Sequence, residues 1–152
     1  MSQVEVVDDF LHALARADLG RASELLDDDL LYQNVGLPSI RSARSTIALF
    51  RRFTRVGRFD VVVHRATGDE DGAVLNERTD LLAFGPFVMT FWVCGVFEVR
   101  DGRITLWRDY FDAVAMLAAA ARGVLGVVVP PLRPALPDGR ATSTGSVSPR
   151  RR

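Results

Sequence analysis

Five polar residues lie in stretches of sequence whose alternation of apolar side chains is typical of β-strands. Tyr32 and Asn34 are two positions apart, Arg78 and Asp80 are also two positions apart, and Asp109 follows in a third stretch. Residues at i and i+2 share one face of a strand, so each pair directs both side chains to one place, ~7 Å apart along the strand. An unpaired charge costs several kcal/mol in an apolar interior, so burial of these charges requires that they meet. The pattern indicates one buried polar site.

The charges of such a site suggest acid–base chemistry. Two carboxylates that share one guanidinium carry a net charge of minus one, and a single added proton makes the group neutral, which an apolar pocket favours. One acid and one base can then coexist near neutral pH. We hypothesise that one aspartate donates a proton while the other, with Tyr32 and Asn34, orients and deprotonates a water molecule. This combination suits the opening of a strained, uncharged electrophile.

The same spacing also fits a purely structural alternative. Arg78 and Asp80 can form an exposed cross-strand ion pair, and Asp109 can cap the helix that follows it. Asp112 stands at the junction between that strand and the helix and is the better N-cap candidate. Asp109 is then left without an evident structural task, but the spacing alone leaves both interpretations open.

Helical periodicity predicts the first elements of the chain. Ser2 and Glu5 have capping-box spacing, and apolar residues recur at helical intervals as far as residues 18–20. The elements expected next are a short helix over residues 21–26, a strand over 30–35 that carries Tyr32 and Asn34, and a third helix with the apolar stripe Ile40, Ala43, Ile47 and Phe50.

The second half of the chain changes to a period of two with short turns. Strands are predicted over residues 59–65, 73–84, 88–100 and 103–111, followed by a helix over 113–121 that packs through Met116, Leu117 and Ala120. Short connections favour a consecutive antiparallel meander. The predicted class is α+β, with a curved antiparallel or mixed sheet packed on the N-terminal helices and a ligand site in its concave side.

The composition fits one compact domain. The chain has 152 residues, 48% hydrophobic and 25% charged, and we expect a single domain over residues 1–126 and a disordered Pro/Ser/Arg-rich tail over 127–152. Nineteen basic residues, all arginine, balance nineteen acidic ones, which offers no footprint for nucleic acid or an anionic membrane. The absence of lysine excludes Schiff-base chemistry and a P-loop.

Other residues restrict the class of protein further. Cys94 is the single cysteine, so an internal disulfide is excluded and a reduced, cytoplasmic setting is expected. No secretory signal and no apolar run long enough for a membrane span is evident. His12 and His64 have no partner at the spacing of metal ligands, so no metal and no cofactor is expected.

The polar residues resemble those of a known family. Tyr32-x-Asn34, Arg78-x-Asp80 and the segment 107–112, Trp-Arg-Asp-Tyr-Phe-Asp, are similar to limonene-1,2-epoxide hydrolase and its bacterial relatives. The fold of that family is similar to the cone-shaped nuclear-transport-factor-2-like and ketosteroid-isomerase scaffold, which has a deep pocket. The resemblance extends from about Val4 to Ala121 and leaves the tail unmatched.

The resemblance implies the one-step, cofactor-free hydration of an apolar epoxide, derived from a terpene, steroid or lipid, to a vicinal diol. In this scheme Asp109 activates water, Tyr32 and Asn34 hold that water, Asp80 protonates the epoxide oxygen and Arg78 bridges the two aspartates. It also implies a homodimer. Apolar residues expected to form the pocket wall, chosen by the face on which they lie, are Leu37, Phe50, Val74, Leu82, Phe91, Trp107 and Phe111.

Two other functions remain open at this level. The first is an isomerase or polyketide-cyclase-like enzyme on the same scaffold, which needs one aspartate kept protonated as a hydrogen-bond donor. The presence of Arg78 argues against an isomerase, because a permanent cation lowers the pKa of such an acid. The second is a non-catalytic module that binds an apolar small molecule and uses the polar groups only as anchors.

Overall fold

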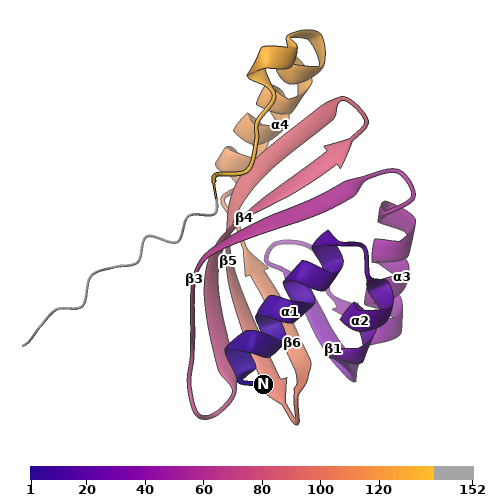
Figure 1. Cartoon of the computed structure of the whole chain (residues 1–152), viewed down its shortest axis with the longest axis vertical. Coiled ribbons are helices and arrows are strands. Elements are labelled where there is room, and N and C mark those ends of the chain that lie inside the picture. Colours follow the sequence, from indigo (N-terminus) through magenta and orange to yellow (C-terminus); the bar gives the residue numbers. More distant parts are fainter. Residues whose placement is uncertain (139–152) are drawn as a thin grey trace, which may run out of the picture.

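A mixed sheet of six strands forms the frame of the molecule (Figure 1). The structure, a computed structural model, describes residues 1–138. The strands lie side by side in the order β2-β1-β6-β5-β4-β3. Their bounds are β1 Leu26–Asn34, β2 Ile40–Arg41, β3 Arg58–Gly68, β4 Ala73–Phe84, β5 Phe87–Arg100 and β6 Arg103–Tyr110.

The four strands from β3 to β6 are consecutive and antiparallel, which confirms the predicted meander. Tight turns join them, and Gly72 and Gly102 adopt φ values of 98° and 75° there, a region that glycine enters without steric cost. β1 then adds to the free side of β6 in parallel, with Tyr32 beside Trp107 and Asn34 beside Asp109. This pairing makes the sheet mixed and brings the first polar pair next to the last aspartate.

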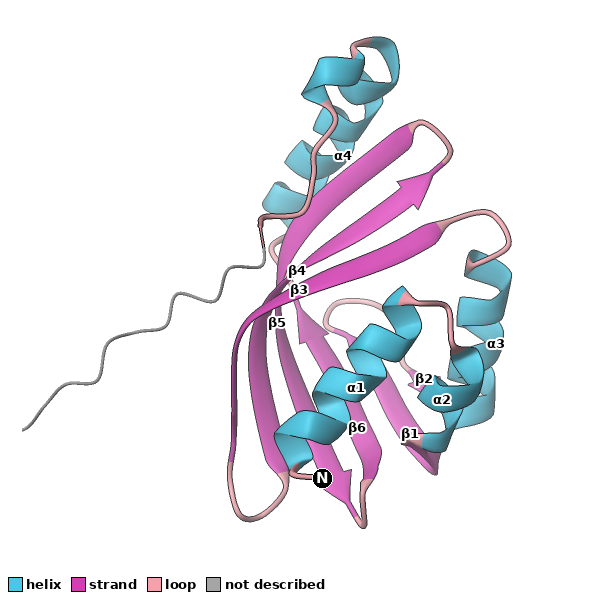
Figure 2. Ribbon diagram, in the orientation of Figure 1, coloured by secondary structure: helices cyan, strands magenta, loops and turns pink. Residues whose placement is uncertain are grey.

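Three helices cover one side of the curved sheet, α1 Gln3–Ala15, α2 Leu19–Glu24 and α3 Ala43–Phe53 (Figure 2). α1 lies across the sheet, whereas α2 and α3 gather near β1. The predicted capping box of α1 is present, because Ser2 Oγ accepts from the Glu5 N–H and the Glu5 carboxylate accepts from the Ser2 N–H. The α+β class with a curved sheet on N-terminal helices is therefore confirmed.

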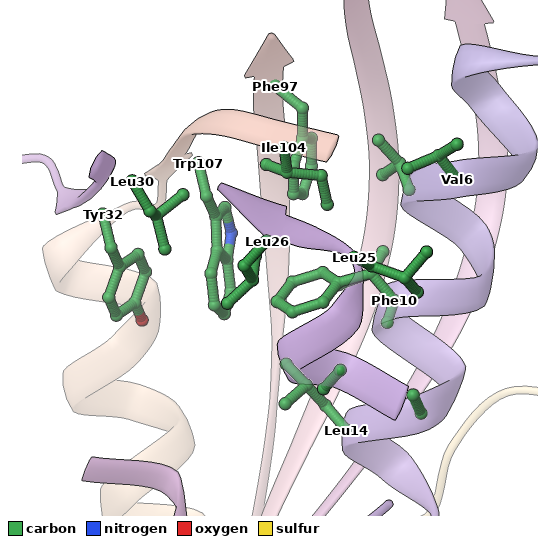
Figure 3. Packing of buried hydrophobic residues seen from close by; sticks show 14 of the residues in the cluster. Val6, Phe10, Leu14, Leu25, Leu26, Leu30, Tyr32, Phe97, Ile104 and Trp107 are labelled. Atoms are coloured by element: carbon green, nitrogen blue, oxygen red, sulfur yellow. The ribbon is translucent and has the colours of Figure 1, made fainter. Parts of the chain in front are cut away.

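Large apolar side chains fill the space between α1 and the sheet (Figure 3). Phe10 of α1 and Leu26 of β1 approach Trp107 of β6, and the Phe10 and Trp107 rings meet edge to face at 5.1 Å. Trp107 is almost fully buried. The core therefore joins the N-terminal helices to β1 and β6, which carry three of the five predicted polar residues.

Several boundaries differ from the predictions. The first helix ends at Ala15, because Ala17 takes a positive φ of 56° and Asp18 caps α2. The predicted strand over 30–35 begins earlier, at Leu26, where Leu26 pairs with Ile104 of β6 before an irregularity in the register. The third helix begins only at Ala43, since Ile40 and Arg41 pair with β1 as strand β2 and Ser42 is the N-cap.

The last helix is longer than predicted. α4 spans Ala113–Val128 and passes the expected end at residue 121 and the expected domain boundary after 126. Gly123 does not end it, because this glycine allows the helix to approach β5 closely, and a Cβ there would lie 2.7 Å from the Phe87 ring and 2.8 Å from the Val88 carbonyl oxygen. Leu117, predicted to pack, is 73% exposed.

α4 packs on β5 near the end of the sheet that lies opposite the N-terminus (Figure 1). A 3₁₀ turn at Pro130–Leu132 follows it. The tail that the sequence predicts to be disordered lies from residue 139 onwards outside the described residues. Within residues 1–138, no helix has both the length and the apolar character that crossing a membrane requires.

Candidate active site

A cavity of about 220 Å³ lies between the sheet, α3 and the start of α4. Every strand from β3 to β6, together with β1, contributes to it, and its wall is mainly apolar. Four of the five predicted polar residues line it or reach it directly, and Arg78 lies behind them. The lining residues are Tyr32, Asn34, Leu37, Phe50, Phe59, Asp80, Leu82, Phe91, Val93, Trp107, Asp109, Phe111 and Met116.

Arg78 joins the two aspartates. Its guanidinium donates from Nε to Asp80 Oδ1 at 2.9 Å and from Nη2 to Asp80 Oδ2 at 3.2 Å, and Nη2 also donates to Asp109 Oδ2 at 2.7 Å. The exposed fractions of Arg78, Asp80 and Asp109 are 0%, 5% and 4%. A two-point contact of a guanidinium with a carboxylate has a defined geometry, so all three side chains are held in fixed relative positions.

The structural alternative is therefore wrong in both of its parts. Arg78 and Asp80 face the interior of the sheet and do not form an exposed pair. Asp112 caps α4 by accepting a hydrogen bond from the Ala115 N–H at 2.7 Å, whereas Asp109 is bound to Arg78. The alternation of β4 places Arg78 and Asp80 on one face, as the i and i+2 spacing predicts.

Tyr32 and Asn34 form the second half of the site. Asn34 Nδ2 donates to the Tyr32 hydroxyl at 2.8 Å, and Asn34 lies beside Asp109 in the parallel pairing of β1 with β6. The Tyr32 ring stacks on Trp107 with a centroid distance of 4.1 Å, which Figure 3 shows from the side of the core. Stacking fixes the ring and hence the position of the hydroxyl group.

Burial controls the protonation of the carboxyl groups. It raises the pKa of Asp80 from 3.8 to about 6 although Arg78 acts in the opposite direction. It also raises the pKa of Asp109, again against the influence of Arg78. Burial favours the neutral form of a carboxyl group, and the neighbouring cation favours the charged form. The two aspartates are thus set to hold a proton at a higher pH than exposed aspartates do.

The remaining groups stay in one protonation state at neutral pH. Burial raises the pKa of Tyr32, and the nearby Asp109 acts in the same direction, so the phenol keeps its proton. Burial disfavours the charged form of Arg78, but Asp109 and Asp80 outweigh this effect, and the pKa of Arg78 lies above its ordinary value. The site therefore combines a permanent cation, a neutral phenol and two carboxyl groups that titrate.

Two buried polar atoms have no hydrogen-bond partner among residues 1–138: Asp109 Oδ1 and Trp107 Nε1. Buried polar atoms without a partner are rare in folded proteins and call for an explanation. Asp109 is among the residues that line the cavity, and the side chain of Trp107, two positions before it on β6, favours its charged form. Within the same residues, no three His, Cys, Asp or Glu side chains are grouped to hold a metal ion.

Most of the predicted wall residues do line the cavity, but Val74 does not. It lies six residues before Asp80 on the same face of β4, about 20 Å away along the strand, where it is fully buried in the core. Shared orientation therefore placed it on the correct face but at the wrong end of the strand.

Phe59, Val93 and Met116 line the cavity and were not predicted to do so. Phe59 and Val93 belong to inward faces that the alternation of β3 and β5 does indicate. Met116, expected to be core filler, reaches the cavity from α4, and no local pattern shows where that helix packs. Asn76, buried beside Arg78, was also missed as a site residue.

Comparison with known proteins extends these observations. Residues 1–122 match the limonene-1,2-epoxide hydrolase catalytic domain. Epoxide hydrolase EphG of Mycobacterium tuberculosis is 52% identical over 131 residues, which are 86% of this chain and 87% of that protein. The solved structure of a limonene-epoxide-hydrolase-like enzyme of M. tuberculosis superposes with a TM-score of 0.85 at 48% identity and covers 88% of this chain and 95% of its own.

More distant structures share the fold alone. A polyketide cyclase-like protein of Pseudomonas putida superposes with a TM-score of 0.71 at 14% identity, over 78% of this chain and 98% of its own. The close matches and the domain match agree with the resemblance inferred from the polar residues. The chain belongs to the limonene-1,2-epoxide hydrolase family.

Proposed function

We propose that the protein is an epoxide hydrolase that adds water to an apolar epoxide in one step and releases a vicinal diol. The observation that carries this proposal is the pair of buried aspartates bound to one arginine, with one oxygen of Asp109 unpartnered beside the cavity. The match to the family and the similarity to EphG support the same activity.

Asp109 acts as the general base in this proposal. Its Oδ2 is held by Arg78, while Oδ1 is available to accept a proton from water. The Tyr32 hydroxyl and the Asn34 amide lie on the neighbouring strand β1 and orient that water. As Asp109 takes the proton, the water oxygen forms a bond to one ring carbon of the epoxide.

Asp80 acts as the general acid. The bond between the attacked carbon and the ring oxygen breaks, its electron pair goes to the oxygen, and Asp80 donates the proton that completes the second hydroxyl group. Burial raises the pKa of Asp80 to about 6, so this group holds a proton much closer to neutral pH than an exposed aspartate does. After the step Asp109 carries a proton and Asp80 does not, so one transfer between them restores the resting state.

The net charge of Arg78, Asp80 and Asp109 together does not change during the proposed reaction step. Arg78 contributes one positive charge and the two aspartates share one proton, so the group is neutral before and after the step. A constant net charge matters in an apolar surrounding, where an uncompensated charge is costly. The same cation is unsuited to an isomerase that needs a permanently protonated aspartic acid, which favours hydration over that alternative.

The wall of the cavity favours an apolar substrate. Phe50, Phe91 and Phe111 line it together with Leu37 and Leu82, and the polar groups that reach it come from β1, β4 and β6. An apolar cavity with a few converging polar groups is the usual form of a small-molecule site. We therefore propose an epoxide derived from a terpene, a steroid or a lipid.

The proposal is tested by hydration of an epoxide panel in water enriched in oxygen-18. We expect terpene, steroid, fatty-acyl and aryl epoxides to include at least one substrate whose diol carries a single labelled oxygen. Replacement Asp109→Asn removes the base and should lower kcat by about 10²–10⁴-fold. Asp28→Asn, an exposed substitution on β1, serves as the matched control and should retain activity.

Full diol formation by Asp109→Asn would contradict the assignment of the base. Binding of an epoxide without any hydration by the unmodified protein would instead favour the small-molecule-binding module. Both outcomes are read in the same assay, since bound substrate and released diol are measured separately.

We also propose that the protein forms a homodimer in the cytoplasm. Large apolar side chains are exposed on the face of the sheet that points away from the cavity, where Leu75, Trp92 and Tyr110 are 46%, 50% and 42% exposed. Contiguous exposed apolar surface is a physical basis for symmetric association. Cys94, the single cysteine, supports the cytoplasmic setting because the chain needs no internal disulfide.

A further inference from the structure

The Arg78 side chain has to cross a strand to reach its second carboxylate. Arg78 belongs to β4 and Asp109 to β6, and β5 lies between them. Neighbouring strands are about 4.8 Å apart, so the two strands are separated by about 10 Å. Gly95 of β5 stands at the crossing point, because it pairs with Asn76 of β4 on one side and with Asp109 of β6 on the other.

Gly95 leaves the space that the guanidinium occupies. A Cβ at this position would overlap Arg78 Nη1 and would lie 2.5 Å from Asn76 Oδ1 and 2.8 Å from the Phe97 ring. Real Cβ atoms do not make contacts this short, so any side chain here displaces the Arg78 group or the strand itself. The close approach, and not the backbone conformation, makes glycine necessary.

Asn76 binds the end of the guanidinium that faces away from Asp80. It is 4% exposed, and its Oδ1 accepts from Arg78 Nη1 at 3.1 Å. Asn76 does not line the cavity. Arg78 thus donates to three side chains in different directions, which fixes both the position of the guanidinium plane and its rotation about its own axis.

We propose that Asn76 and Gly95 are positioning residues of the hydration reaction, which hold Arg78 so that Nη2 faces Asp109. This inference rests on the proposed function. Asn76 acts through Arg78, because it supplies a neutral acceptor for Nη1 and leaves the positive charge to the two aspartates. Gly95 acts through the absence of a side chain, because a Cβ there would occupy the space through which Arg78 reaches from β4 toward β6.

The neutrality of Asn76 has a chemical consequence. The titratable groups around the guanidinium are Asp80 on the same strand, Asp109 on β6 and Tyr32 on β1. The residues that β5 and β3 place against it, Gly95 and Val63, do not titrate. A third carboxylate at position 76 would add a negative charge to this group, compete for the cation and make the catalytic carboxyl groups harder to ionise.

The substitution Asn76→Asp tests this inference with almost no change of shape. We expect the acidic limb of the kcat/KM profile to move to higher pH by about one unit, the usual size of the effect of one nearby like charge. Carbon-13 NMR of the labelled aspartate carboxyl groups should show Asp80 and Asp109 titrating at higher pH by a similar amount. Glu77→Gln is the matched control, an exchange of carboxylate and amide on the opposite face of the same strand.

Two further variants test the same inference should Asn76→Asp fail to fold. Asn76→Ser shortens the acceptor, and Gly95→Ala crowds the guanidinium, so both should lower kcat about tenfold or more with little change in KM. Both should also raise the titration midpoint of Asp109, because Arg78 holds it less well. If Glu77→Gln moves the carboxyl titrations as much as these variants do, or if none of the position-76 and position-95 variants moves them, the inference is overturned.

The NMR titration separates this inference from the proposed function. If no epoxide of the panel is hydrated by the unmodified protein, the proposed function fails, whereas the titration of Asp80 and Asp109 still reports whether Asn76 and Gly95 position Arg78. If hydration proceeds and the titrations do not respond, the function stands and the positioning role fails.

Discussion

Asp80 and Asp109 bind the same guanidinium in different ways, and the difference suits their proposed roles. Both oxygens of Asp80 accept from Arg78, whereas Asp109 uses only Oδ2 for that contact. Oδ1 of Asp109 has no partner among the described residues, and Asp109 pairs with Asn34 in the parallel register of β1 and β6. A base needs a lone pair for its proton source, which is why we propose Asp109 and not Asp80 for that role.

The raised pKa of Asp80 leads to a prediction about stability. The folded protein holds this proton up to about pH 6, whereas the ordinary value is 3.8, because burial disfavours the carboxylate. Between these values the folded state binds more protons than the unfolded chain, so the free energy of unfolding should fall as the pH rises through this interval. The contribution of Asp80 is complete below about pH 4, is lost above about pH 6, and amounts to roughly 3 kcal/mol.

Urea unfolding at pH 4, 5, 6 and 7 measures this dependence. Asp80→Asn cannot ionise, and its free energy of unfolding should therefore change less with pH over the same interval than that of the unmodified protein. The difference between the two proteins reports the titration of Asp80 together with its effect on Asp109, which shares the same guanidinium. Identical pH dependence in both would show that Asp80 titrates at an ordinary value in the folded state.

At the scale of the elements, the bridge from β4 over β5 to β6 requires both the length and the forked shape of arginine. Arg78→Lys keeps the positive charge, but a single ammonium group cannot donate to Asp80, Asp109 and Asn76 from the positions that the guanidinium occupies. We expect kcat for diol formation to fall by at least about 10²-fold, in the range of losses caused by misplacement of reacting groups.

Arg108→Lys is the control for this substitution. Arg108 precedes Asp109 on β6, points to the other face and donates to Gln33 Oε1 at 2.8 Å, outside the cavity lining. This variant should keep nearly full activity in the same assay. Equal activity of Arg78→Lys and the unmodified protein would mean that charge alone, and not the three-way contact, is what the site needs.

Side-chain direction within a strand could be predicted from the sequence, whereas the pairing of distant strands could not. Alternation alone placed Arg78 and Asp80 on one face of β4, because side-chain direction in a strand is a local property. The pairing of Asn34 with Asp109 joins segments 75 positions apart, and nothing near either residue specifies it. The last helix was predicted to end at residue 121, whereas α4 continues through Gly123, which serves its close packing on β5.

The sequence analysis did not predict the site residues whose positions depend on how distant elements pack. Met116 reaches the cavity because α4 packs on β5, and Asn76 contacts Arg78 because Gly95 leaves room for the guanidinium. Val74 was placed in the wall because its face is the correct one, although its distance along the strand is not. Residue type and spacing thus identify the reacting groups better than they identify the groups that surround them.

At the scale of the whole molecule, the exposed face of the sheet determines the expected state in solution. Leu75, Trp92 and Tyr110 lie on β4, β5 and β6, on the side opposite Arg78, and the three strands are neighbours. Trp92 is half exposed and donates from Nε1 to Glu77 Oε1 at 3.1 Å, which satisfies the one polar atom of its ring. Such an arrangement favours burial against a second copy.

Sedimentation equilibrium tests the proposed dimer through Trp92→Lys. The unmodified protein should sediment at twice the monomer mass, and the variant should shift toward the monomer, because association would bury an unpaired ammonium group at a cost of several kcal/mol. Leu49→Lys, at an exposed apolar position of α3 away from this face, is the matched control and should leave the mass unchanged.

Dissociation by Leu49→Lys but not by Trp92→Lys would place the contact on the helices, and a monomeric unmodified protein would refute the dimer itself. Because Trp92 lies outside the cavity lining, any monomer that forms should keep the titrations of Asp80 and Asp109, which would show that one chain builds the whole site.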